Sequence, residues 1–240
     1  MAKKQHCIII DTESTIDNKV ADFAAVIVDR KGNILNKCAV LVRGIYDNRN
    51  ISPLFHNENI GELWKARNLD KRYSHYDRML ESGTRMLASI NAINRWLDTA
   101  AKEYSPLYLT AYNLPYDVNL CQKTAIDLTM FPYRFCLWSA AFNKWAKSRK
   151  YRKFIVDNHG FNSPTELGNM SYKTNAEIMA RFVLENNELP DEPHTALEDI
   201  IGYELPILTK LLKTEKFSSL LELEPYNWRK LQVRDNFKPK

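Results

Sequence analysis

The sequence predicts an α/β fold in which helices flank a mixed central sheet, with an antiparallel hairpin joined to parallel strands. Three β-rich runs near the N-terminus, two of them around a turn that contains Gly32, indicate an antiparallel half-sheet. Beyond residue 84, a helical apolar period leads into another short apolar run, which indicates a parallel strand reached through a crossover helix. Together these patterns favour the α/β class.

The composition limits the size of the core, the kinds of partner and the cellular compartment that we expect. With 240 residues, 45% of them hydrophobic, the chain can bury a sizeable core as one large domain or two small ones. No apolar run approaches the roughly 18 residues of a membrane span, so we expect no membrane partner. The four cysteines show no zinc-ligand spacing and favour a reduced, cytoplasmic setting. The net charge of +5 suits an anionic partner.

The first β-rich run ends in two carboxylates. Residues 7–11 are β-branched and predict a buried central strand, which continues through Thr12 and Glu13. Because side chains alternate along a strand, Asp11 and Glu13 should point to the same side, roughly 7 Å apart. Two such carboxylates repel each other unless a cation lies between them. The alternative is a solvated strand end without function.

The hairpin is followed by an irregular insertion and then a helix. Residues 22–28 and 34–42 predict the two hairpin strands. Residues 43–77 show no clean period, and they indicate equally a lid that stacks on bases or a peripheral helical excursion. An apolar stripe with spacings of three and four residues, from Met86 to Ala101, predicts a helix over residues 84–104.

A second polar group follows the strand predicted over residues 107–112. Pro115 suits a first helical position, which places Asp117 in the first turn of a helix. One interpretation is that Asp117 only compensates the helix dipole. The other is that Asn113 and Asp117 face the same crevice as Asp11, because ligands of α/β folds bind at the carboxyl ends of parallel strands.

A basic stretch follows a further strand predicted over residues 134–138. Residues 139–153 are predicted to be helical, and they carry six Lys and Arg residues, no acidic residue and several aromatic ones. Such a mixture is typical of grooves that follow a nucleic-acid backbone, and Lys147 and Lys150 are the candidate contacts. A solvated helix face explains the charges equally well. Further on, Thr174 and Glu177 predict a capping box.

A third polar group lies at another helix start. Thr195 is a good N-cap, and Glu198 three residues later completes a capping box. His194 and Asp199 then occupy the positions whose side chains meet at a helix start, near its positive end. This pairs a base with a carboxylate suited to binding a metal. The helix should run to about residue 213 and bend at Pro206.

Taken in order, the three groups resemble the motifs of the DEDDh branch of DnaQ-like 3′–5′ exonucleases, which share a ribonuclease-H-like fold. The matching patterns are Asp11-x-Glu13, Asn113-x-x-x-Asp117 and His194-x-x-x-x-Asp199. The sequence departs from the family at Tyr112, where a His is frequent, and at Ile16, where a Gly is frequent. By this resemblance residues 1–213 form a single exonuclease domain, with the insertion at 43–77 and the basic stretch at 139–153, and residues 214–240 form a tail.

The resemblance implies a metal-dependent 3′–5′ exonuclease that releases 5′-mononucleotides from single-stranded nucleic acid, with DNA favoured over RNA. Its cofactors would be two Mg²⁺ or Mn²⁺ ions, held by Asp11, Glu13, Asp117 and Asp199, with His194 as general base. These five residues would form the catalytic set. Of the remaining candidates, the resemblance places Thr12, Ser14 and Asn113 against the substrate.

Two other functions fit the same residues. One is a catalytically weak module that only binds nucleic acid, which the basic stretch favours. The other is a hydrolase of very short oligonucleotides that is similar to oligoribonuclease. The resemblance also implies a stand-alone enzyme of the kind that bacteria and phages encode, which would act in the host cytoplasm if viral, and it allows a homodimer.

Overall fold

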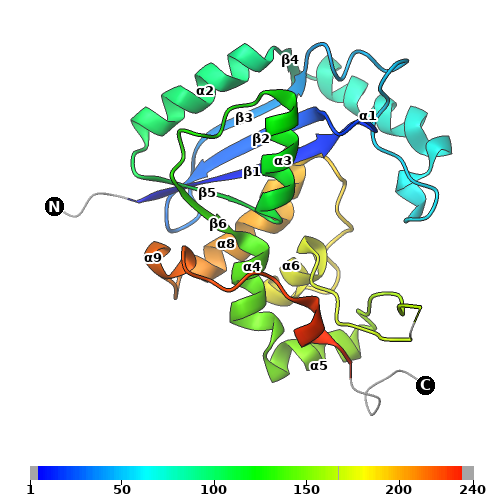
Figure 1. Ribbon diagram of the computed structural model, residues 1–240, viewed down its shortest axis with the longest axis vertical. Helices are drawn as coiled ribbons and strands as arrows, with labels where there is room; N and C mark the ends of the chain where they lie inside the picture. Colours follow the sequence, from blue (N-terminus) through cyan, green and yellow to red (C-terminus); the bar gives the residue numbers. More distant parts are fainter. Residues whose placement is uncertain (1–4, 167, 234–240) are drawn as a thin grey trace.

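A single mixed sheet lies at the centre of the computed structural model, which describes residues 5–166 and 168–233 (Figure 1). Its six strands lie in the order β4-β3-β2-β1-β5-β6, and helices flank the sheet. The predicted α/β class with a mixed sheet is therefore confirmed, and the arrangement is compatible with a ribonuclease-H-like fold. The strands are β1 (His6–Ser14), β2 (Val20–Val28), β3 (Ile34–Val42), β4 (Met86–Ala88), β5 (Leu107–Ala111) and β6 (Tyr133–Cys136).

Strand directions follow the predicted pattern. β2 pairs antiparallel with both β1 and β3, while β1 pairs parallel with β5 and β5 with β6. At the centre of the sheet, Ile9 of β1 is paired with Val26 of β2 on one side and with Thr110 of β5 on the other. Residues 7–10 are fully buried, because helices cover both faces of β1. A strand buried on both faces reads as a continuous apolar run, which is why the sequence revealed it.

Two helical layers cover the sheet. One layer packs α2 (Ile90–Glu103) and α3 (Leu114–Thr124) against the face that carries Ile8 and Ile10. The opposite face, with Cys7 and Ile9, meets the other layer. That layer contains α4 (Leu137–Ala141), α5 (Arg149–Asp157), α6 (Ala176–Leu184), α7 (Ala196–Asp199), α8 (Leu205–Leu212) and α9 (Phe217–Leu220).

The predicted helix over residues 84–104 is wrong at its start. Met86, Leu87 and Ala88 form β4, which pairs parallel with the end of β3, and Met86 is 64% exposed. The helix begins only at Ile90, where the Ser89 hydroxyl accepts a hydrogen bond from the backbone of Ala92. Pairing with an unpartnered sheet edge outweighed the local helical period, as tertiary context often does.

Two predictions around the basic stretch also need correction. Residues 139–153 form no single helix, because α4 runs into a π-helical segment (Phe142–Ala146) and α5 starts again behind Ser148 as its N-cap. The capping box at Thr174 is absent: Asn175 is the N-cap of α6. The Thr174 hydroxyl instead accepts a hydrogen bond of 2.9 Å from the Trp138 indole, because the residue is buried.

The insertion over residues 43–77 contains the peripheral helix that was one of its two interpretations. Its second half carries two 3-10 turns (Glu62–Trp64 and Ala66–Asn68) and the peripheral helix α1 (Leu69–Glu81). The two halves together bury a separate cluster that includes Tyr46, Leu54 and Tyr76 against one end of the sheet. Its first half is mostly irregular and approaches the carboxyl end of β1, where Phe55 donates a backbone hydrogen bond to Ser14.

The C-terminal segment that the sequence set apart as a tail packs against the domain as far as it is described. Phe217, Leu220, Leu231 and Val233 are buried in the core cluster below the sheet. A short 3-10 helix (Trp228–Leu231) lies beside the end of α5 (Figure 1). Across the described residues, no helix combines the length and the apolar character that crossing a membrane requires.

Candidate active site

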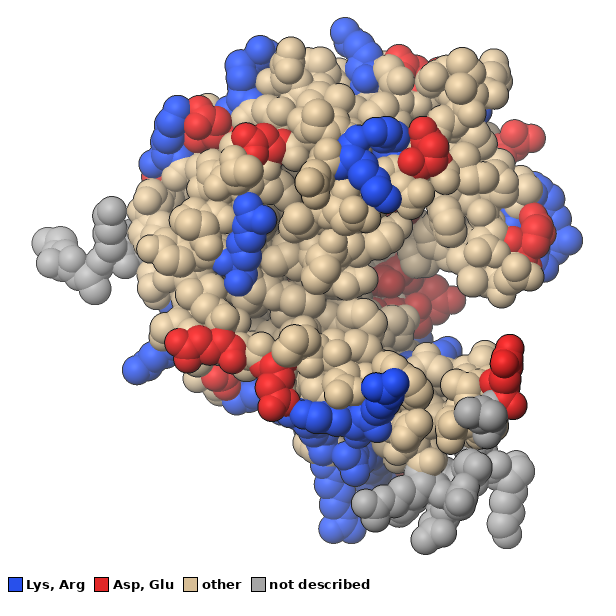
Figure 2. All heavy atoms as spheres, in the orientation of Figure 1, with Lys and Arg blue, Asp and Glu red and all other residues tan. Residues whose placement is uncertain are grey.

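One pocket of about 580 Å³ contains side chains from all three polar sequence groups. It lies at the carboxyl ends of β1 and β5, which is where α/β folds bind their ligands. Figure 2 shows acidic side chains inside a hollow between the upper and lower parts of the molecule. The polar groups that line it from the three motifs are Asp11, Thr12, Glu13, Ser14, Asn113, Asp117, His194 and Asp199.

β1 carries the first two carboxylates into the pocket. Asp11 and Glu13 share the face of the sheet that packs on α7, because they alternate with Thr12 along the strand. Burial raises the pKa of Asp11 to about 7, and burial together with the charge of Asp11 raises the pKa of Glu13 well above its ordinary value. Within the described residues, Asp11 Oδ2 is buried without a hydrogen-bond partner.

The start of α3 supplies the third carboxylate. Asp117 lies in the first turn, and its Oδ1 accepts a hydrogen bond of 2.8 Å from the Thr12 hydroxyl. Burial and the charge of Asp11 raise the pKa of Asp117 well above its ordinary value. Asn113, which lines the pocket ahead of this helix, has a φ of 138°, a strained conformation of the kind that gathers at functional sites.

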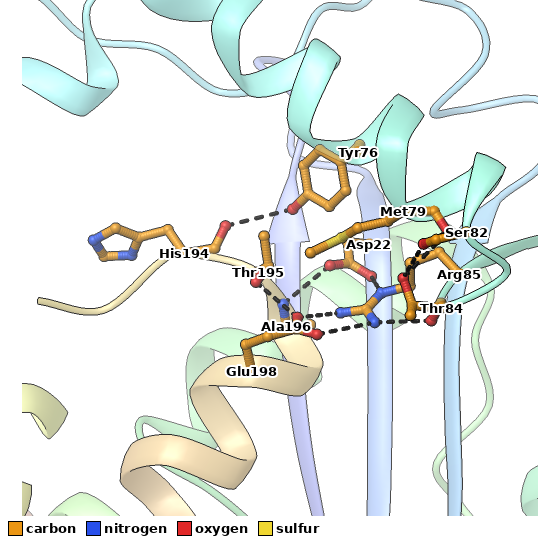
Figure 3. A network of polar contacts seen from close by, with 10 residues as sticks. All are labelled: Asp22, Tyr76, Met79, Ser82, Thr84, Arg85, His194, Thr195, Ala196 and Glu198. Atoms are coloured by element: carbon orange, nitrogen blue, oxygen red, sulfur yellow. Dashed lines mark hydrogen bonds and ion pairs between the residues drawn. The ribbon is translucent and has the colours of Figure 1, made fainter. Parts of the chain in front are cut away.

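The helix start that carries Asp199 is held by a buried ion-pair network. Asp22 on β2 accepts a hydrogen bond of 3.0 Å from the backbone of Ala196 and lies 3.3 Å from the Arg85 guanidinium (Figure 3). Arg85 also contacts Glu198 at 2.5 Å. The predicted capping box is therefore replaced, because Thr195 donates to the Glu198 carboxylate and Asp22 caps the helix from the sheet.

His194 precedes this helix with a φ of 54°, a second left-handed residue in the pocket. Its carbonyl accepts a hydrogen bond of 3.4 Å from the Tyr76 hydroxyl, while its imidazole points away from the network of Figure 3. The ring lies 4.7 Å from the ring of Trp64, centroid to centroid. Burial and the charge of Arg72 lower the pKa of His194 to about 4, so its imidazole is neutral at pH 7.

The geometry of the cluster suits a divalent cation. Glu13, His194 and Asp199 each bring one ligand atom into a group whose members lie within 4.8 Å of one another. Like Asp11 Oδ2, Asp199 Oδ1 is a buried oxygen that lacks a hydrogen-bond partner in the described part of the chain. Buried carboxylates that repel one another and lack donors are suited to hard cations such as Mg²⁺ or Mn²⁺.

Sequence reasoning missed two further carboxylates in the pocket. Burial raises the pKa of Glu192 to about 8, and it raises that of Glu204 well above its ordinary value. Glu204 Oε1 accepts a hydrogen bond of 3.3 Å from the backbone of Tyr112, and its Oε2 has no partner among the described residues. Glu204 ends the π-helical segment just before Pro206. The bend predicted at Pro206 was therefore the sequence feature that pointed to this part of the helix.

Aromatic side chains from regions outside the three motifs form two walls of the pocket. On one side stand Phe55 and Trp64 of the insertion, whose rings lie 5.7 Å apart. On the other side, Tyr226 of the C-terminal segment stacks on Trp138 at 3.9 Å. The insertion also supplies Arg72, a buried guanidinium that lies 4.0 Å from the carboxylate of Glu13.

The two lysines proposed as substrate contacts lie outside this pocket. Lys150 forms an exposed ion pair with Glu185, 2.8 Å long. Lys147 donates to the side chain of Asn143 and lines a separate cavity. Thr12, Ser14 and Asn113 do line the pocket, although the Thr12 hydroxyl is engaged with Asp117.

Comparisons with known proteins add no family assignment. No protein-family model matches the chain, and no curated protein shows significant sequence similarity to it.

Proposed function

We propose that this chain is a metal-dependent 3′–5′ exonuclease of the DEDDh, DnaQ-like class, which releases 5′-mononucleotides from single-stranded DNA. The observation that carries the proposal is the single pocket into which Asp11, Glu13, Asp117, His194 and Asp199 all project. These residues come from three segments that are distant in sequence, and their order and spacing match the motifs of that class.

The proposed cofactor fits the side chains present. Asp11, Glu13, Asp117 and Asp199 would hold two Mg²⁺ or Mn²⁺ ions, which when bound supply an activated water and charge stabilisation for the leaving group. The two buried carboxylate oxygens without hydrogen-bond partners, on Asp11 and Asp199, support this assignment. Glu13 has Arg72 at 4.0 Å, which offsets part of the negative charge of the cluster.

The remaining residues have roles that follow from their contacts. His194 is neutral at pH 7 because its pKa is lowered, so it can accept the proton of an attacking water. Trp64 packs against the imidazole and holds its orientation. The walls formed by Phe55 and Trp64 and by Trp138 and Tyr226 can stack on an unpaired base, which favours a single-stranded 3′ end.

A time course with labelled oligonucleotides tests the proposal. Matched DNA and RNA strands, single and double, carry a 5′ label and are incubated with Mg²⁺ or Mn²⁺. We expect stepwise shortening from the 3′ end, fastest on single-stranded DNA, and none in chelator or with the Asp11→Ala variant. If the wild-type chain shortens none of these strands with either metal, the proposal is wrong.

The rival functions make different predictions for the same assay. A pure binding module would bind the strands in chelator and leave them intact with metal, but a pocket lined by six carboxyl groups offers few donors to the phosphates that it would bind. A hydrolase of very short oligonucleotides would cleave dinucleotides faster than 12-mers. We infer a cytoplasmic setting, with which the four free cysteines agree, and a homodimer remains an implication of the class alone.

A further inference from the structure

A second cavity of the molecule, separate from the acidic pocket, has Lys or Arg at six of its nine lining residues. Its volume is about 940 Å³, and it lies between α5 and the 3-10 helix Trp228–Leu231. Figure 2 shows Lys and Arg side chains gathered on the lower part of the molecule, where α5 lies. We call this cavity the basic groove; its lining residues are Lys147, Arg149, Arg152, Lys153, Val156, Tyr172, Arg229, Lys230 and Gln232.

Only part of this positive charge is neutralised by neighbouring carboxylates. Lys153 pairs with Asp157 at 2.7 Å, and Lys230 pairs with Glu224 at 2.6 Å. Arg149 and Arg152 are exposed and form no ion pair within the described residues. Lys147 donates to the Asn143 side chain and lies over the ring of Phe142, and its charge helps to lower the pKa of Glu224 without forming an ion pair in the described part of the chain. The groove therefore keeps a surplus of unpaired cations, which is complementary to a polyanion.

The basic groove and the acidic pocket are lined by different residues, some of which lie close together in the sequence. Tyr226 lines the pocket and Arg229 lines the groove, and three residues of chain span at most about 11 Å. Similarly, Tyr172 lines the groove and Thr174 lines the pocket. A strand whose end lies in the pocket would therefore reach the groove within a few nucleotides.

We propose that the basic groove binds the phosphates of a single strand on the 5′ side of the nucleotide that lies in the acidic pocket. This inference rests on the proposed function, because the acidic pocket supplies the end of the strand. The two cavities, which carry opposite charge, then have different roles. The carboxylates of the pocket serve the chemistry, and the cations of the groove supply the affinity for phosphate. Strands too short to reach the groove are bound without its help.

Binding measured without turnover tests the proposal. The probes are 5′-fluorescein dT12 and dT3, whose anisotropy is followed in chelator across a salt series. The test variant combines Lys147→Gln, Arg149→Gln and Arg152→Gln. For single strands the salt slope is about −0.7 per phosphate contacted, so three lost contacts should reduce the slope by about 2. We expect at least tenfold weaker binding of dT12 and unchanged binding of dT3.

A matched control removes the same charge elsewhere. It combines Lys31→Gln with Arg95→Gln and Lys102→Gln on α2, all of them exposed and outside the groove. The control should bind dT12 as the wild type does, with the wild-type salt slope. Circular dichroism melting of both triple variants verifies that they are folded.

The outcomes separate the groove from the catalytic proposal. Equal loss of dT12 binding in the groove variant and the control overturns the groove, because only net charge then matters. Loss confined to the groove variant upholds it. If the wild type also fails to cleave any strand with metal, that same binding result upholds the groove and counts against the exonuclease alone.

Discussion

At the scale of single residues, the pocket is a group of carboxylates that destabilise one another. Burial raises the pKa values of Asp11, Glu13, Asp117 and Asp199, and each is raised further by the charge of another carboxylate. Such a group is costly to fold without a cation. These candidate residues are thus distinguished by the free energy that burying them together costs.

Replacing one of these carboxylates should therefore separate stability from activity. Asp11→Asn removes a buried charge that its neighbours repel, so we expect a higher free energy of unfolding in chelator, together with loss of cleavage. Urea unfolding in chelator and the oligonucleotide assay measure the two effects. Glu188→Gln, at an exposed loop position, should change neither. A less stable metal-free Asp11→Asn protein would contradict the repulsion argument.

His194 can act as a base or as a metal ligand, and one variant distinguishes the roles. As a general base, its loss in His194→Gln should lower kcat by roughly 10²–10⁴-fold. As a ligand in the group with Glu13 and Asp199, its loss should also weaken metal binding. Calorimetric titration with Mn²⁺ measures the affinity. We expect unchanged affinity with reduced kcat, and a large loss of affinity would reassign His194 to the metal site.

At the scale of elements, the position of α7 decides whether the third motif reaches the pocket. α7 is the first turn of a helix that continues through the π-helical segment Ile200–Glu204 into α8, so its position depends on what holds this first turn against the sheet. Asp22 and Arg85, both with fully buried side chains, anchor its first turn to β2 and to the segment before β4. Neither residue belongs to the motifs, yet both position His194 and Asp199.

Removing one member of this anchor should cost far more than removing the pair. Asp22→Ala removes the fully buried partner of the Arg85 guanidinium, leaving it only the partly exposed Glu198, and it also removes the acceptor of the Ala196 N–H, so we expect a loss of about 3–5 kcal/mol in the free energy of unfolding. The double variant Asp22→Leu with Arg85→Met should lose much less, because apolar groups then replace both charges. Denaturant unfolding measures both. Equal losses in the two variants would mean that the ion pair itself carries the stability.

At the scale of the whole molecule, the acidic pocket links stability to pH, and under the proposed function it also links stability to metal. The native pKa values of Asp11 and Glu192 are about 7 and about 8, above the ordinary values of 3.8 and 4.5. The native state therefore binds more protons than the unfolded state between these limits, and its stability falls as pH rises. His194 has the opposite effect below pH 6.5, because its native pKa of about 4 is lowered.

The carboxylate effect should thus be cleanest between pH 6.5 and 8. In chelator we expect the melting temperature to fall steadily across this window, because the native carboxyls lose their protons there while the unfolded ones are already ionised. Saturating Mg²⁺ should raise the melting temperature most at the alkaline end. Thermal unfolding followed by circular dichroism measures both series. A flat profile in chelator would show that the carboxylates do not interact as the structure indicates.

The sequence by itself determined the parts of the fold that rest on local chemistry. A continuous apolar run predicted β1, and two β-rich runs around a Gly-containing turn predicted the hairpin. Strand ends and helix starts predicted where the three polar groups lie. It failed where partners are distant in sequence. Met86 lies in an edge strand and not in a helix. The Thr174 hydroxyl accepts a hydrogen bond from the Trp138 indole and does not cap a helix.

Only the tertiary structure decided which other side chains meet the three motifs. Glu192 and Glu204 join the carboxylates, Trp64 meets His194, and Asp22 caps α7 across the sheet. It also places Lys147 in the lining of the basic groove and not in that of the acidic pocket. The physical reason is that spacing along a strand or helix fixes only near neighbours, whereas burial, repulsion and ion pairing depend on which segments the fold brings together.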